Sequence, residues 1–231
     1  ADYSDAAGNV QTTPTTWTAA VAGTPDYYPL ADGRRMEYAE SGAEGTIGDT
    51  DPDAEYETEQ FVQFDAQGGG VFHRTRYADG TYTEPRDWGV MQQVSGALEY
   101  LGFGEVDGGE TFAVDFDSPL TFTTLPPAGT WDDQTTATVT GEGTFTLTGA
   151  GEMVSESDLP WLTGEMEVFW KDVRLVVIDH SIAAGSDLIE TGVDSLWLSP
   201  TVGIVQYATY AEDLQENSWD YDRGLLMPPG D

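Results

Sequence analysis

Short runs in which apolar and polar residues alternate predict that this chain is built from β-strands. Glu59–Asp65 and Val71–Tyr77 both alternate, and Gly68-Gly69-Gly70 stands between them where a tight turn is needed. Alternation puts successive side chains on opposite faces, which is typical of a strand with one buried face. A second turn at Ala78-Asp79-Gly80 leads into Thr81-Tyr82-Thr83. The pattern therefore predicts a meander of antiparallel strands.

The second half of the chain repeats this pattern. Thr111–Phe116 is one expected strand, and Thr136–Thr140 and Thr144–Thr148 are two more, joined by a turn at Gly141-Glu142-Gly143. The longest apolar-rich run is Glu165–Ile178, which makes it the best candidate for a central strand.

Helical signals are scarce by comparison. Leu159-Pro160-Trp161 and the segment from Ala211 to Gln215 could each form a turn or two of helix. The sequence thus predicts an all-β protein with an antiparallel, strongly curved sheet, either a half-barrel or a sandwich, and minimal helix.

The N-terminal segment differs from the rest of the chain in composition. Residues 1–24 are small, polar and rich in Thr, and are expected to form an extended arm or linker before a single β-rich domain at 25–231. Alternatively, residues 10–21, with Trp17 among them, form a strand that joins a neighbouring copy and drives self-association. Because the chain starts at Ala1 without Met, it resembles a product of signal-peptide cleavage, which predicts an extracellular, periplasmic or cell-surface location.

Charge narrows the possible partners. The 231 residues include 42 acidic and 8 basic ones, for a formal net charge of -34. Such a surface repels nucleic acid and anionic membranes, so neither is expected as a partner. No apolar run approaches the roughly 20 residues of a transmembrane helix. The near-absence of Lys suggests a halotolerant protein, and an ordinary acidic secreted protein is the alternative. The absence of Cys excludes disulfides and thiolate chemistry.

Four segments, in order, carry a resemblance to known proteins. They are Tyr27 to Tyr38, with Met36 where Trp is usual, Pro119 to Trp131, Val173 to Gly185, and Trp197 to Val205. In these motifs the chain resembles a loosely defined group of bacterial exported and lipoprotein-like β domains of unknown function. The resemblance implies a strongly curved antiparallel sheet, similar to the half-barrels of periplasmic lipoprotein carriers, and it implies no catalytic residues.

An acidic loop is the clearest candidate for metal binding. Asp49, Asp51, Asp53 and Glu55 alternate along the chain, so their oxygens could converge on Ca²⁺. An EF-hand is excluded, because Ala54 stands where the loop needs Gly and Gln60 where it needs Glu. Ca²⁺ is the one cofactor that the sequence suggests, and a solvated run of charge is the alternative. The sequence assigns no catalytic residue and no cofactor-binding residue.

Three functions remain open at this point. The leading hypothesis is a non-enzymatic exported protein of the cell envelope or extracellular space, such as a structural subunit of a filament or surface layer. The second is a lipid-binding or small apolar ligand-binding module, whose concavity would be lined by Phe112, Phe116, Trp170 and Val176. The third is a carboxylate-dependent glycoside hydrolase or carbohydrate binder, in which Trp88, Trp161 and Trp219 would stack on sugars.

Overall fold

The computed structural model describes residues 3–4, 10–11, 26–41, 56–139, 142–160, 169–213 and 218–225 of the chain. Strands make up most of these residues, and none of them is helical. The strands are β1 (Tyr3–Ser4), β2 (Val10–Gln11), β3 (Arg34–Ser41), β4 (Tyr56–Gly68), β5 (Val71–Tyr77), β6 (Pro85–Val94), β7 (Ala97–Asp107), β8 (Glu110–Thr124), β9 (Thr130–Val139), β10 (Gly143–Pro160), β11 (Phe169–Ala184), β12 (Asp187–Ser199), β13 (Gly203–Asp213) and β14 (Ser218–Leu225).

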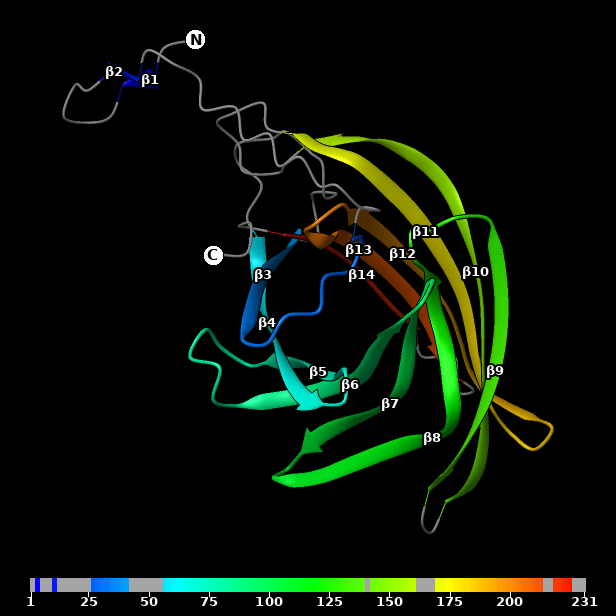
Figure 1. Cartoon of the computed structure of the whole chain (residues 1–231). Coiled ribbons are helices and arrows are strands. Elements are labelled where there is room, and N and C mark those ends of the chain that lie inside the picture. Colours follow the sequence, from blue (N-terminus) through cyan, green and yellow to red (C-terminus); the bar gives the residue numbers. More distant parts are fainter. Residues whose placement is uncertain are drawn as a thin grey trace.

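Strands β3 to β14 form one antiparallel meander in which each strand pairs with the next along the chain. The sheet curves strongly, and it closes where β14 pairs with β3 through three residue pairs (Figure 1). This confirms the predicted all-β fold with an antiparallel, strongly curved sheet, and the single sheet corresponds to the half-barrel rather than the sandwich. No helix able to cross a membrane is found among the residues described here. We call the space enclosed by the curved sheet the lumen.

Side chains replace part of the backbone pairing between β8 and β9. The register of these two strands contains one residue pair, Phe116 with Ala137. Beyond it, the Asp133 carboxylate accepts hydrogen bonds from the backbone N–H and the hydroxyl of Thr121, both at 2.8 Å. The Thr135 hydroxyl likewise donates to the carbonyl of Ser118 at 2.7 Å. The junction therefore depends on acidic and hydroxyl side chains that satisfy exposed strand edges.

A short segment before β3 closes one end of the lumen. Tyr28 is buried there, with its ring edge-on to Phe64 of β4 and Phe122 of β8. Its hydroxyl donates to the sulfur of Met91 in β6 at 3.7 Å. Because these partners come from separate strands around the ring, Tyr28 acts as a plug against which the strands pack.

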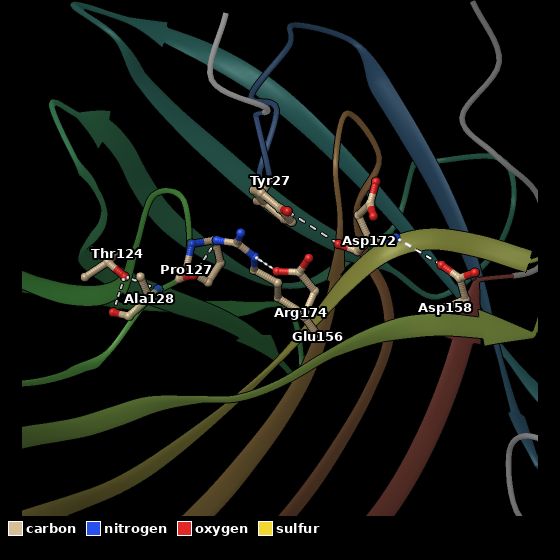
Figure 2. A network of polar contacts seen from close by, with 8 residues as sticks. All are labelled: Tyr27, Thr124, Pro127, Ala128, Glu156, Asp158, Asp172 and Arg174. Atoms are coloured by element: carbon tan, nitrogen blue, oxygen red, sulfur yellow. Dashed lines mark hydrogen bonds and ion pairs between the residues drawn. The ribbon is translucent and has the colours of Figure 1, made fainter. Parts of the chain in front are cut away.

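The neighbouring Tyr27 fixes this plug to the other side of the sheet. The Arg174 guanidinium of β11 lies 4.8 Å from the Tyr27 ring, pairs with Glu156 at 2.9 Å and donates to the carbonyl of Pro127 at 2.7 Å. The Tyr27 hydroxyl donates to the carbonyl of Asp172 at 3.4 Å. Figure 2 shows Arg174 at the centre of these contacts, so one side chain joins the plug, β10, β11 and the β8–β9 loop.

Glycine permits the tight turns that open β3 and β9. Gly33 has φ of 72° and Gly129 has φ of 63°, in the left-handed region that residues with a Cβ avoid. Each follows a Pro-containing segment by a few residues and directly precedes its strand. Both segments contribute anchors to the core, Met36 after the first turn and Trp131 after the second.

Two local predictions were wrong. The segment Thr81–Thr83, expected to continue the meander as a strand, lies in a turn, and β6 begins only at Pro85. The reason is Tyr82, whose backbone has a φ of 57°. Its ring packs against those of Phe61 and Tyr77 and lies under the Arg35 guanidinium. The helical turns expected at residues 159–161 and 211–215 are strand in their described parts. Leu159 pairs with Trp170, and Ala211 pairs with Gly192 and Trp219, so sheet pairing overrides the weak local preference.

The core consists of two clusters inside the ring. The larger one surrounds the plug and includes Tyr38, Val62, Leu98, Val176 and Leu198. The smaller one joins β8 to β11 near the other end of the strands and is formed by Val114, Ala137, Leu147 and the residues packed on them. The lumen is therefore packed with apolar side chains at the plug and along one wall, and it keeps a cavity elsewhere.

Candidate functional site in the lumen

The described part of the chain contains a cavity of about 360 Å³ in the lumen. Its lining combines aromatic, aliphatic and charged side chains from β5, β6, β7, β8, β12 and β13, together with the plug. The lining residues are Tyr28, Arg74, Arg76, Asp87, Trp88, Gly89, Met91, Tyr100, Phe103, Gly104, Glu105, Phe122, Asp194, Leu196, Ile204, Tyr207 and Thr209.

Strand alternation explains why charged residues reach the lumen. In β5, Arg74 and Arg76 share one face, and both line the cavity. His73 lies between them in the strand and does not line the cavity, and its ring stacks on that of Trp88 with centroids 6.3 Å apart. Arg74 and Arg76 are thus directed into the lumen.

The cavity opens away from the plug. Tyr28 lies at the end of the sheet where β3 begins, and Arg76, Asp87 and Glu105 lie toward the opposite ends of their strands. Glu105 is exposed to solvent, whereas Tyr28 is buried. A ligand would therefore enter past Arg76 and Glu105 and reach Tyr28 last.

The charge of Arg76 is balanced by an ion pair within the cavity wall. Its guanidinium pairs with the Asp87 carboxylate of the adjacent strand at 2.5 Å through both Nε and Nη2. Burial disfavours the charge of Arg76, but the hydrogen bonds and the negative charge of Asp87 raise the pKa of the guanidinium overall. This bidentate pair is geometrically strong, and it fixes both side chains in the wall.

Arg74 lies deeper and has a different environment. Burial disfavours its charge, and the titratable side chains around its guanidinium are those of four tyrosines, Tyr28, Tyr38, Tyr207 and Tyr100. Burial also raises the pKa of the phenols themselves, to about 12 for Tyr100. At neutral pH, Arg74 is therefore a cation surrounded by neutral hydroxyl groups.

A histidine between two carboxylates forms a further part of the lumen. His180 of β11 lies over Gly192 of β12, where an added Cβ would come within 2.5 Å of Nε2. Its ring nitrogens are 3.6 Å from Glu190 and 3.5 Å from Asp194, and Asp194 also accepts a hydrogen bond from the Thr209 hydroxyl at 2.7 Å. Burial opposes the charge on His180, but these two acids raise its pKa to about 9.

This cluster predicts a pH dependence of stability. The folded-state pKa of His180 lies above its ordinary value of about 6.5, so its stabilising charge is fully present below pH 6.5 and is lost as pH rises toward 9. Because the side chain is 25% exposed, we expect a loss on the order of 1–2 kcal/mol across this range. Urea unfolding of wild type and His180→Gln between pH 6 and 9.5 measures it.

His180→Gln should remove most of the change in unfolding free energy with pH. His73→Gln, which changes the histidine of β5, is the matched control and should retain the wild-type pH dependence. If His180→Gln unfolds with the same pH dependence as wild type, the charge of His180 does not contribute to stability.

The residues singled out in the sequence lie elsewhere. Asp49, Asp51, Asp53 and Glu55 fall outside the described residues, and within those residues no group of three His, Cys, Asp or Glu side chains could hold a metal ion. The Ca²⁺ site therefore stays a prediction. Of residues 10–21, the structure describes Val10–Gln11, which pairs with Tyr3–Ser4.

The predicted apolar lining does not form the cavity. Phe112 is 41% exposed and Val176 is fully buried. Phe116 packs in the smaller core cluster, and Trp170 packs on the larger one. Of the tryptophans proposed to stack on sugars, Trp88 does line the cavity, and its ring lies against Gly104 and His73. The side chains of Trp161 and Trp219 are outside the described residues.

The sequence did contain a signal for the residues that line the cavity instead. Phe72, Arg74 and Arg76 alternate with His73, Thr75 and Tyr77, so the arginines share a face with Phe72 rather than with the polar side of the strand. In an antiparallel meander this places them on the same side as Phe64 and Val62 of the preceding strand, their cross-strand partners. Cross-strand register, which the sequence leaves open, was needed to draw that conclusion.

Comparison with known proteins gives two structural neighbours. A putative lipoprotein from Parabacteroides distasonis matches with a TM-score of 0.41 and 12% identity, over 88% of this chain and 98% of that one. A putative exported protein with YmcC-like fold from Bacteroides fragilis matches with a TM-score of 0.36 and 12% identity, over 87% and 97%. Neither a protein-family model nor a curated protein matches the chain.

Proposed function

We propose that this chain is an exported protein that binds a small amphipathic molecule in its lumen. The observation that supports this proposal is the cavity of about 360 Å³, blocked at one end by Tyr28 and open toward Glu105 at the other. Small-molecule sites are concave and largely pre-formed, and they place a few polar groups among apolar walls. The lumen meets each of these conditions.

Apolar and charged side chains line the same cavity, so one molecule could contact both. Met91, Phe122, Leu196 and Ile204 offer apolar surface, and Arg74 offers a charge beside it. A purely apolar ligand would leave this cation without a partner, and a purely polar one would leave the apolar side chains facing water. An amphipathic ligand satisfies both kinds of surface.

Filling the cavity tests this proposal. Leu196 lines the cavity, whereas Val193 on the same strand is exposed on the outer face. We expect Leu196→Trp to lose ligand binding at least tenfold and Val193→Trp to retain it, because only the first indole occupies the lumen. Calorimetric titration with eight-carbon chains carrying a carboxylate, a hydroxyl, a trimethylammonium group or a glucose measures the affinity.

At least one of the four compounds should bind with a stoichiometry of one. Preference for the glucoside with no dependence on its alkyl chain would favour the carbohydrate-binding alternative. Absence of binding by all four compounds, or equal binding by Leu196→Trp, would contradict a ligand site in the lumen.

A further inference from the structure

We infer that Arg74 selects ligands with an acidic headgroup, so that the lumen binds an organic carboxylate with an apolar tail. This inference rests on the proposed function and specifies its ligand class. It depends on the partners of Arg74, on the state of the surrounding tyrosines and on the position of the apolar lining.

Arg74 is one of two basic residues that line the cavity, and it differs from the other, Arg76, in having no carboxylate partner among the described residues. Arg76, Arg174 and Lys171 each pair with a carboxylate, that of Asp87, Glu156 and Asp158 respectively. Arg34 donates to the carbonyls of Pro29 and Val202. No carboxylate among the described residues pairs with Arg74, although acidic residues outnumber basic ones by 42 to 8 in the chain.

Two of the three acids that line the cavity already have partners. Asp87 is held by Arg76, and Asp194 is held by His180 and by the Thr209 hydroxyl. Glu105 lies at the open end, where it is exposed to solvent. The lumen therefore keeps one cation free of acids at its inner end, close to Tyr28.

The tyrosines around Arg74 cannot replace an anion. Burial raises the pKa of Tyr28, Tyr38 and Tyr100, so their hydroxyls are neutral at physiological pH. The hydroxyls of Tyr28 and Tyr100, which line the cavity, can donate hydrogen bonds to a carboxylate oxygen, whereas that of Tyr38 donates to the carbonyl of Ile204 at 3.0 Å. The Tyr28 hydroxyl donates to the sulfur of Met91, a weak acceptor, at 3.7 Å, and a carboxylate oxygen would be a stronger acceptor. Guanidinium and phenol groups together form a site for a planar, singly charged oxyanion.

The apolar lining gives the rest of the ligand a place. Phe122 stacks on Tyr100 with ring centroids 5.8 Å apart, and both line the cavity with Leu196 and Ile204. A carboxylate at Arg74 would thus have its tail against these side chains, of which Phe122 contacts Tyr28 at the inner end. The acid would enter past the exposed carboxylate of Glu105, which favours ligands with one negative charge over those with several.

The test uses octanoate, octanol and octyl phosphate with wild type, Arg74→Gln and Arg74→Lys in 150 mM NaCl. We expect octanoate to bind wild type roughly 10- to 100-fold more tightly than octanol, the range that one charge-assisted hydrogen-bonding contact supplies. Arg74→Gln should remove this difference by weakening octanoate alone. Arg74→Lys should retain part of it, because the charge remains.

Arg86→Gln is the matched control, since Arg86 is exposed on β6 and does not line the cavity. It should bind octanoate as wild type does. Circular dichroism establishes that each variant is folded, and octanol binding establishes that its cavity is intact. Octyl phosphate distinguishes a carboxylate site from a phosphate site: equal or tighter binding of the phosphate would overturn the choice of carboxylate.

The outcomes separate this inference from the proposed function. If octanol binds as tightly as octanoate and Arg74→Gln changes neither, Arg74 does not select the ligand, and the lumen remains a binding site for neutral molecules. If neither octanoate nor octanol binds wild type, the inference fails, and the proposed function fails with it when the trimethylammonium and glucose compounds do not bind either.

Discussion

Replacing Tyr28 by Ala is expected to lower the free energy of unfolding by about 3–5 kcal/mol, the range for removing a large buried aromatic side chain. The Tyr28 ring is 3% exposed and contacts Phe64 and Phe122 edge-on, so its loss leaves the larger core cluster without its centre. The second expected consequence is functional, because the lumen would then be open at both ends. Urea unfolding followed by tryptophan fluorescence measures the first effect.

Tyr210→Ala is the matched control. Tyr210 lies on β13 with 46% of its surface exposed, so its removal should cost no more than about 0.5 kcal/mol. A loss for Tyr28→Ala as small as that of the control would show that the plug does not hold the strands together.

Gly102→Ala is expected to destabilise the protein by about 3 kcal/mol, at the upper end of the usual cost of overpacking. A Cβ at this position would lie 2.3 Å from the carbonyl oxygen of Val114 in the neighbouring strand. Backbone atoms cannot move aside as a flexible side chain can, so β7 and β8 would have to separate. Thermal unfolding of the variant should show a correspondingly lower midpoint.

Gly149→Ala is the control for this substitution, because its nearest contact would be Leu120 Cδ2 at 3.9 Å, an ordinary van der Waals distance. Gly149→Ala should leave the free energy of unfolding nearly unchanged. If Gly102→Ala is equally well tolerated, the close approach of β7 to β8 at this point is not required for folding.

The strand pattern of this fold could be predicted from its sequence because each strand buries one face. Val71–Tyr77 was predicted with the bounds that the structure has, since glycines and a turn limit it on both sides. Tyr82 could not be placed, because its backbone conformation is set by contacts with Phe61, Tyr77 and Arg35 that come from other strands. Local propensity contains no information on such contacts.

The candidate site was less predictable than the fold. Acidic residues are so abundant that runs such as Asp49 to Glu55 attract attention, whereas the described cavity is distinguished by a basic residue. Arg74 becomes notable only when β5 is paired with β4 and β6 and its face is known to be the inner one. Aromatic residues chosen by type alone, such as Phe112, fell on exposed positions for the same reason.

The arrangement of charge links the fold to the proposed function. The chain has a net charge of -34, while the cavity keeps Arg74 among neutral tyrosines. Keeping a partly buried cation without an acid costs stability, and apolar replacements at such positions are often neutral or stabilising. Binding of an acidic ligand would explain why the protein keeps Arg74 at a position where it costs stability in the absence of ligand.

The most direct test of this account is a crystal structure of the protein with 8-bromooctanoate, in which the anomalous signal of bromine locates the end of the tail. The account predicts a bromine peak inside the lumen and carboxylate density within hydrogen-bonding distance of the Arg74 guanidinium. Bromine peaks on the outer surface alone, or a carboxylate bound away from Arg74, would contradict it.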